Sequence, residues 1–143
     1  MDQQQLRSRL QGCYVTIPTL FDDDSLEVNF EGISQHVEFL IAGGLQEGTG
    51  LILSGGGAGD FSTMSIAERI EVARTVVEAA AGRIPVTVGA QTTSTVEAVE
   101  LATAAQNLGA DFIQCHHRST FLTPRMIFSS TSRPPRRPPR KWG

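Results

Sequence analysis

Residues 50–69 read GLILSGGGAGDFSTMSIAER, and this stretch decides the fold because it contains a change from strand to helix. Residues 51–53 form an apolar run with glycines on both sides, which predicts a short buried strand. Ser65 and Glu68 have the spacing of a capping box, which predicts a helix that starts after Ser65. Residues 55–60 are therefore predicted to be a glycine-rich loop at the carboxyl end of a strand.

The same alternation continues in both directions along the chain. Further strands are predicted from short apolar, β-rich runs at residues 13–19, 84–88 and 112–113. Helices are predicted between the strands, and their boundary residues are Asn29 and Gly43, Ser65 and Gly82, and Ser94 and Gly109.

The last of these helices carries two further signals. Ser94 and Glu97 have the spacing of a second capping box. Apolar residues then recur every three positions, which predicts that one face of the helix is formed by Val96, Val99, Ala102 and Ala105.

The resulting order is β-α-β-α-β-α-β. The strands show almost no polar alternation, which favours a parallel sheet covered by helices. Four strand–helix units form either a small open doubly wound sheet or half of an eight-stranded barrel. A closed barrel needs about 200–250 residues, so we expect at most part of one from 143 residues.

Charge is divided unevenly along the chain. Residues 1–111 hold all 15 acidic residues and five of the twelve basic ones, whereas residues 112–143 hold seven basic residues and no acidic one. Five of the seven prolines also lie in the second part. We therefore expect an α/β region at residues 1–115 and a disordered, basic, Arg/Pro-rich tail at residues 116–143.

The overall composition is that of an ordinary soluble protein, with a net charge of −3, 40% hydrophobic residues and 19% charged residues. No apolar run approaches the ~20 residues of a membrane span, and the first residues lack the apolar stretch of a secretory signal. Cys13 and Cys115 cannot form a disulfide scaffold, so we expect a cytoplasmic protein without a membrane partner. Both cysteines fall in predicted strands, which predicts buried thiols.

The glycine-rich loop is the most distinctive candidate site, because reactive surfaces of parallel α/β folds lie at the carboxyl ends of the strands. Its backbone N–H groups could hold an anion, or its glycines could serve only a tight turn. No Gly-Lys-Ser/Thr follows, and Asp60 stands where a dinucleotide fingerprint needs its third glycine. Cys115, His116 and His117 are adjacent, but neighbours in an extended segment point to opposite faces, so we expect no metal site.

Several motifs, in order along the chain, resemble the dihydrodipicolinate synthase / N-acetylneuraminate lyase family. Residues 12–21 are similar to its opening strand, Gly-x(6)-Thr-Pro-Phe, with Leu20 in place of the proline. Residues 56–65 are similar to its loop Gly-Thr-Thr-Gly-Glu-Phe-x-Thr-Leu-Ser. The remaining matches keep the family's spacing and lie at residues 83–89, 95–98 and 109–111. Together the motifs cover residues 10–115 nearly without gaps.

The resemblance implies a partial (β/α)8 TIM barrel, about four βα units of the amino-terminal half, from a Schiff-base (class I) lyase or aldolase that is usually a homotetramer. In that family a lysine attacks the keto carbon of pyruvate or another 2-keto acid and a tyrosine relays protons; no cofactor is expected. Gly57 and Ala58 stand at the positions of the family's carboxylate-binding hydroxyl pair. The other residues of the nearby loops are Thr19, Gly56, Gly59 and Asp60.

No catalytic residue is expected in this chain. The resemblance places the lysine on the sixth strand of the barrel and the tyrosine on the fifth, and neither strand is predicted here. The one lysine, Lys141, lies in the Arg/Pro-rich tail. We therefore expect an inactive fragment whose last strand edge and inner apolar face are uncovered.

The tail leaves two interpretations. If one cytosine is supplied after the Cys115 codon, residues 116–121 permit Pro-Pro-Pro-Phe-Tyr-Phe, which continues the family's fourth strand, and the Arg/Pro run becomes an acidic helix. The tail is then a shifted reading frame. In the alternative interpretation the chain is a small α/β module that binds an anion or nucleotide and whose basic tail binds nucleic acid.

Overall fold

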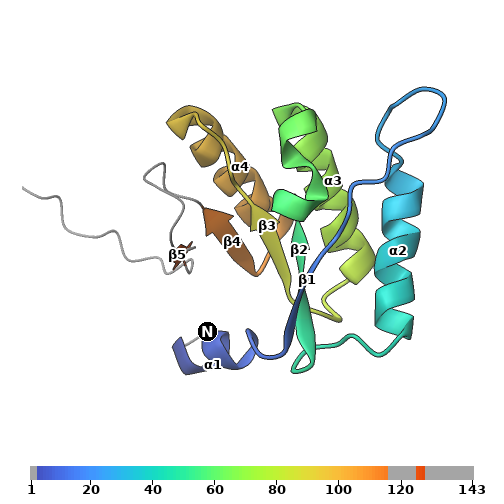
Figure 1. Cartoon of the computed structure of the whole chain (residues 1–143). Helices are drawn as coiled ribbons and strands as arrows, with labels where there is room; N and C mark the ends of the chain where they lie inside the picture. Colours follow the sequence, from blue (N-terminus) through green and yellow to red (C-terminus); the bar gives the residue numbers. More distant parts are fainter. Residues whose placement is uncertain (1–2, 116–124, 128–143) are drawn as a thin grey trace, which may run out of the picture.

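The computed structural model describes residues 3–115 and 125–127, and Figure 1 shows strands alternating with helices in the predicted α/β order. In residues 3–115 the strands are β1 (Cys13–Thr16), β2 (Gly50–Ser54), β3 (Val86–Gly89) and β4 (Phe112–Cys115). The helices between them are α2 (Phe30–Ala42), α3 (Ile66–Ala80) and α4 (Thr95–Leu108), and a short helix α1 (Gln3–Ser8) precedes β1.

Strands β1 to β4 pair in sequence order and all in parallel, which confirms the predicted parallel sheet. The register sets Ile52 between Val15 and Val86, so these side chains share one face of the sheet. Ile52 and Val86 belong to the core that packs against α2 and α3. The first strand ends at Thr16 rather than at the predicted residue 19, because Pro18 has no N–H to continue the ladder.

The predicted N-cap residues Asn29, Ser65 and Ser94 are confirmed at the starts of α2, α3 and α4. The N–H of Gly32 donates to Asn29 Oδ1 at 2.7 Å. In α3 the capping box is complete: the N–H of Ser65 donates to Glu68 Oε2 at 2.7 Å, and the N–H of Glu68 donates to Ser65 Oγ at 3.3 Å.

The second predicted capping box is only half formed. The N–H of Glu97 donates to Ser94 Oγ at 3.4 Å, but the Glu97 carboxylate accepts a hydrogen bond from the hydroxyl of Thr92 instead of returning to the cap. The prediction of a reciprocal pair is therefore wrong. A competing hydroxyl in the preceding loop satisfies the carboxylate.

The prediction that Val96, Val99, Ala102 and Ala105 share one face of α4 is also wrong. Val96 and Val99 are 77% and 62% exposed, whereas Leu101 and Ala105 are buried. An α-helix turns about 100° per residue, so each three-residue step rotates the side chain back by about 60°. Over the three steps from Val96 to Ala105 the direction reverses, and only the last of these positions faces the core.

The sheet is strongly curved. The Tyr14 hydroxyl on β1 donates to Gln114 Oε1 on β4 at 3.3 Å, across two intervening strands. In a flat sheet, strands three positions apart are about 14 Å apart. Such a contact is typical of the wall of a barrel.

Curvature also buries the face of the sheet away from the helices. Leu53, Thr87 and Phe112 are neighbours in register on that face, and all three are 5% exposed or less. The expectation of an uncovered inner face is therefore wrong for these residues.

The sheet edges differ from expectation as well. A short strand, β5 (Arg125–Ile127), pairs antiparallel with β4, so the edge of the last predicted strand is not free.

Cys13 on β1 is exposed and Cys115 is partly exposed, so the prediction of buried thiols is wrong. Within the described residues β1 pairs with a strand on one side only, which leaves Cys13 without cover.

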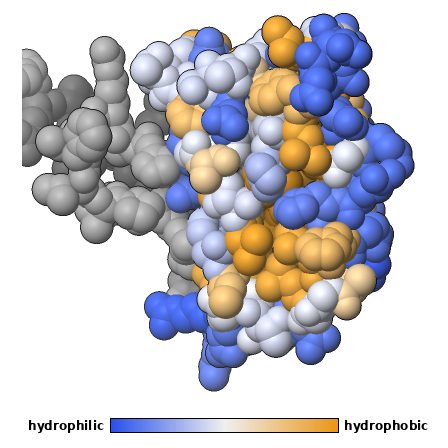
Figure 2. Space-filling model, turned by 45° about the vertical axis from the view of Figure 1, so that its right-hand side comes forward, coloured by the Kyte–Doolittle hydropathy of each residue, from blue (hydrophilic) through white to orange (hydrophobic). Residues whose placement is uncertain are grey.

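Hydrophobic surface remains on the side of the molecule that carries α2. Figure 2 brings this side forward and shows a band of hydrophobic residues running down it. Phe39 on α2 is 70% exposed. None of the described helices has the length and hydropathy needed to cross a membrane.

Apart from residues 125–127, the predicted tail at residues 116–143 lies outside the described residues. Its expected disorder therefore stays a prediction. Lys141, His116 and His117 fall in this part of the chain.

Two carboxyl groups make stability sensitive to acid. Hydrogen bonds from Ser65 lower the pKa of Glu68, and a hydrogen bond from Arg83 lowers that of Glu38. Folding that lowers a carboxyl pKa contributes stability above its ordinary value of 4.5, and this contribution is lost as the pH falls through the folded-state pKa. We expect the free energy of unfolding to decrease below about pH 4.5.

The change Glu68→Gln should make this decrease smaller, because glutamine keeps the cap but has no charge to lose. Urea unfolding at neutral and acid pH measures the difference. Glu100→Gln is the control, since Glu100 is exposed on α4. If the free energy of unfolding of Glu68→Gln falls in acid as much as that of the parent chain, Glu68 is not a source of the acid sensitivity.

Candidate functional site

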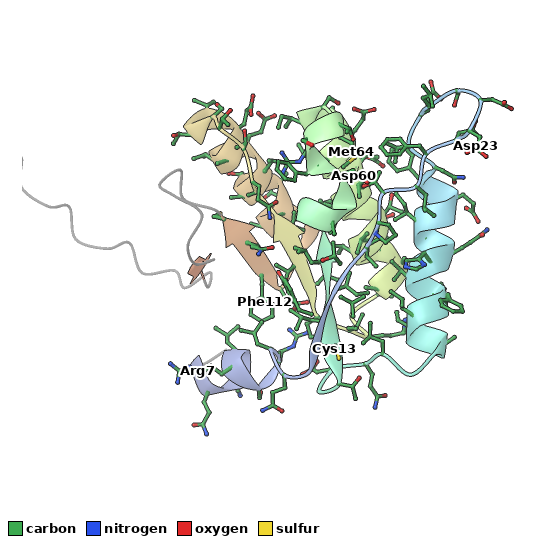
Figure 3. The ribbon with its side chains drawn as sticks, in the orientation of Figure 1. Arg7, Cys13, Asp23, Asp60, Met64 and Phe112 are labelled. Carbon is green, nitrogen blue, oxygen red and sulfur yellow. The ribbon has the colours of Figure 1, made fainter. Side chains whose placement is uncertain are left out.

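Three loops meet at the carboxyl edge of the sheet. Thr19 follows β1, the glycine-rich loop follows β2, and residues 90–93 follow β3. Figure 3 shows Asp60 and Met64 at this edge, at the opposite end of the sheet from Cys13. The carboxyl ends of parallel strands carry the reactive surface in folds of this kind. The structure brings the three candidate loops together at this edge, and their role as a binding site stays a prediction.

The glycine-rich loop forms two tight turns. Gly57–Gly59 is a 3-10 turn, η1, and Phe61–Thr63 is a second one, η2. Asp60 joins them in the left-handed conformation, with φ 49° and ψ 34°. Gly57, Ala58 and Asp60 are exposed, whereas Gly59 is buried.

Backbone packing requires glycine at several positions of the loop. A Cβ at Gly59 would lie 2.9 Å from the carbonyl oxygen of Ile17, and a Cβ at Gly56 would overlap the Leu53 side chain. A Cβ at Gly89 on β3 would overlap the carbonyl of Gly55. For these residues the tight-turn interpretation holds.

Gly57 is different, because nothing lies within 4 Å of a Cβ placed there. Gly57 and Ala58 open the 3-10 turn, so their N–H groups have no acceptor within it. Neither amide is bonded to another part of residues 3–115, whereas the N–H of Gly59 donates to the carbonyl of Gly56 at 2.9 Å. The loop thus presents two adjacent exposed donors.

Thr19 holds the glycine-rich loop in place through a hydrogen bond. Thr19 is 7% exposed, and its hydroxyl donates to the carbonyl oxygen of Gly59 at 2.6 Å. The predicted site residues in the loops after β1 and β2 are therefore in direct contact. This hydrogen bond holds the buried end of η1 and leaves Gly57 and Ala58 facing outward.

Arg69 is a residue of this edge that the sequence patterns missed. It is 6% exposed and stands on the buried face of α3 with Val72, Ala73 and Val76. Its guanidinium donates to the carbonyl oxygens of Gly89 at 3.1 Å and Gln91 at 2.9 Å. The missed signal was a charged residue at a core position of a helical pattern.

A cluster of polar side chains lies next to the loops. Gln91 Nε2 donates to Gln114 Oε1 at 3.4 Å, and the same oxygen accepts from Tyr14. Burial raises the pKa of Tyr14. The side-chain oxygens of Ser54 and Gln91 are buried, and neither has a hydrogen-bond partner in the part of the chain that the structure describes. Within residues 3–115 and 125–127, no three or more His, Cys, Asp or Glu side chains group as metal ligands.

The two glycines of η1 provide a matched test. We expect Gly59→Ala to destabilise the chain by about 1–3 kcal/mol, because the added methyl group meets the Ile17 carbonyl. Gly57→Ala should change stability by less than about 0.5 kcal/mol, since its Cβ has open space. Urea unfolding of both variants measures this. Equal effects would show that the loop has another conformation.

Comparison with known proteins gives one consistent result. The family model described as the Dihydrodipicolinate synthetase family matches residues 9–115. The 4-hydroxy-tetrahydrodipicolinate synthase of Pseudomonas syringae pv. syringae is 42% identical over 102 residues, which cover 71% of this chain and 33% of the relative. The enzyme of the same name from Methanopyrus kandleri is 36% identical over 105 residues, 73% of this chain and 34% of the relative.

Comparison with solved structures points to the same family. A dihydrodipicolinate synthase from Oceanobacillus iheyensis superimposes with a TM-score of 0.75 at 27% identity, over 85% of this chain and 39% of that one. The enzyme from Acinetobacter baumannii, solved in complex with pyruvate, gives a TM-score of 0.67 at 35% identity, over 74% of this chain and 35% of that one. Strands β1 to β4, with helices α2 to α4 between them, therefore correspond to part of a TIM barrel.

The chain spans about a third of the length of the curated relatives that it matches. The family match extends from Arg9 to Cys115, a range that includes the glycine-rich loop. This chain belongs to the dihydrodipicolinate synthetase family.

Proposed function

We propose that residues 9–115 are the amino-terminal part of a Schiff-base lyase or aldolase that acts on pyruvate or another 2-keto acid. The observation that carries this proposal is the pair of exposed, unbonded amides of Gly57 and Ala58 at the carboxyl end of β2. In the family these positions hold the carboxylate of the substrate. The pyruvate complex of the Acinetobacter baumannii relative supports this substrate class.

The loop would bind a carboxylate through its backbone alone. Backbone N–H groups at the start of a helical turn make charge-assisted hydrogen bonds to an anion. The family's two hydroxyls are replaced by Gly57 and Ala58, so the loop also lacks a hydroxyl for proton relay. This departure disfavours the synthase reaction itself and favours another reaction of the family.

The chain alone would be inactive. Its one tyrosine, Tyr14, lies on β1 rather than on a fifth barrel strand, and its one lysine, Lys141, lies outside the described residues. Schiff-base formation needs a lysine with a lowered pKa in a closed site. The homotetramer implied by the resemblance is a proposal for the whole enzyme.

The proposal predicts where pyruvate contacts the chain. In an NMR titration of the ¹⁵N-labelled protein, pyruvate should shift the Gly57 and Ala58 amides with a Kd of about 1 mM or weaker. Restoring the hydroxyl pair by Gly57→Thr with Ala58→Thr should tighten binding by about fivefold, because two donors are added. Phosphate is the comparison ligand. Binding of phosphate without pyruvate would favour the anion-binding module instead.

Covalent trapping tests the inactivity. Pyruvate with borohydride should leave no adduct on this chain, whereas the full-length Pseudomonas syringae relative serves as the positive control. Intact-mass measurement gives the result. An adduct on Lys141 would show that the tail supplies the nucleophile and would overturn the inactive-fragment interpretation.

We further propose that residues 116–143 are translated from a shifted frame. The family match stops at residue 115, next to the change from acidic to basic composition. Tryptic digestion of the protein made in cells that carry the gene distinguishes the frames. The frame as written yields a peptide covering residues 84–118, whereas the shifted frame continues from Cys115 into a proline- and aromatic-rich sequence. Detection of the first peptide would exclude the shifted frame.

A further inference from the structure

The Arg69 guanidinium connects three segments of the chain. Arg69 belongs to α3, and its Nη1 and Nη2 atoms donate to the Gln91 and Gly89 carbonyl oxygens at 2.9 Å and 3.1 Å. The guanidinium carbon also lies 5.2 Å from the ring centroid of Phe61, in η2 of the glycine-rich loop. One side chain therefore touches both loops of the candidate site.

Burying this charge is costly unless polar groups compensate for it. Two carbonyl oxygens and the Phe61 ring face the guanidinium, and the nearby Glu97 carboxylate favours its charged form. Arg69 Nε has no hydrogen-bond partner among the described residues. An apolar side chain would fit the buried face of α3 with less desolvation, so packing alone does not account for an arginine here.

Backbone contacts connect Arg69 to the segment that contains the exposed amides. Gly89, whose carbonyl Arg69 binds, packs so closely on Gly55 that a Cβ there would overlap the Gly55 carbonyl. Gly55 begins the glycine-rich loop, and Phe61 lies in its second turn, η2. Arg69 thus restrains both ends of the segment that contains Gly57 and Ala58.

We propose that Arg69 is a positioning residue that holds the glycine-rich loop against the β3–α4 connection, so that the Gly57 and Ala58 amides form one fixed pair of donors. This inference rests on the proposed carboxylate-binding function. A flexible loop would have to order on binding, and that ordering lowers affinity. Arg69 would therefore act on substrate affinity without touching the substrate.

Two measurements test the inference on the 143-residue chain. Hydrogen exchange follows three amides in these loops. The N–H groups of Gly59 and Thr63 donate to Gly56 and Asp60 within the glycine-rich loop, and the N–H of Ala90 donates to the Gln114 carbonyl on β4 at 2.8 Å. We expect Arg69→Met to reduce their protection by about tenfold and to weaken pyruvate binding by about tenfold. The amide of Cys13, bonded to Thr49 at the far end of the sheet, should be unaffected.

Milder variants cover the case in which Arg69→Met does not fold. Phe61→Leu removes only the ring contact and should give a smaller loss, while Arg69→Lys should recover part of the protection because lysine cannot bind both carbonyls in the same way. Arg74→Met is the matched control, since Arg74 is an exposed arginine on the same helix.

The inference is overturned if exchange in both loops stays within about twofold of the parent chain in every folded Arg69 and Phe61 variant. It is also overturned if pyruvate affinity stays unchanged while loop exchange increases. Absence of pyruvate binding in the parent chain would instead refute the proposed function, and the exchange measurements alone would then decide the role of Arg69.

Discussion

The close contact between the Gly55 carbonyl and the Gly89 backbone is the constraint on which the site depends. It brings the carboxyl ends of β2 and β3 together without side chains between them. The glycine-rich loop can then turn outward over the edge of the sheet, with Thr19 bonded to its buried end and Arg69 bonded to the neighbouring loop. A larger residue at position 89 would separate the two loops and move the exposed amides.

The sheet that contains this contact is curved. A sheet in which Tyr14 on β1 reaches Gln114 on β4 is bent like a barrel wall, and its burial decreases from the central strands to the edge strand β1. The relatives are about three times as long as the part they share with this chain. The exposed Cys13 and the hydrophobic band beside α2 are the surfaces expected where further barrel units would pack.

Local patterns were enough to predict the element order, the parallel sheet, the Ser65 cap and the position of the loop, because each depends on neighbours in sequence. Three features depend on contacts distant in sequence or on competing partners, and they were missed or predicted wrongly. Thr92 captures the Glu97 carboxylate, Cys13 has a paired strand on one side only within the described residues, and Arg69 bonds to carbonyls about 20 residues away. The error at Val96 is local, because a period of three residues does not match the turn of an α-helix, about 3.6 residues. Separating the glycines that packing requires from Gly57 also needed coordinates.

We propose that residues 9–115 are the first part of a barrel whose remaining strands, with the lysine and the relay tyrosine, are encoded in another frame. The test is to sequence the coding DNA across the Cys115 codon and the next few hundred bases. We predict one additional base after that codon, followed by an open frame that encodes further βα units and a lysine on a strand. Confirmation of the present frame, with no such units downstream, would contradict the claim.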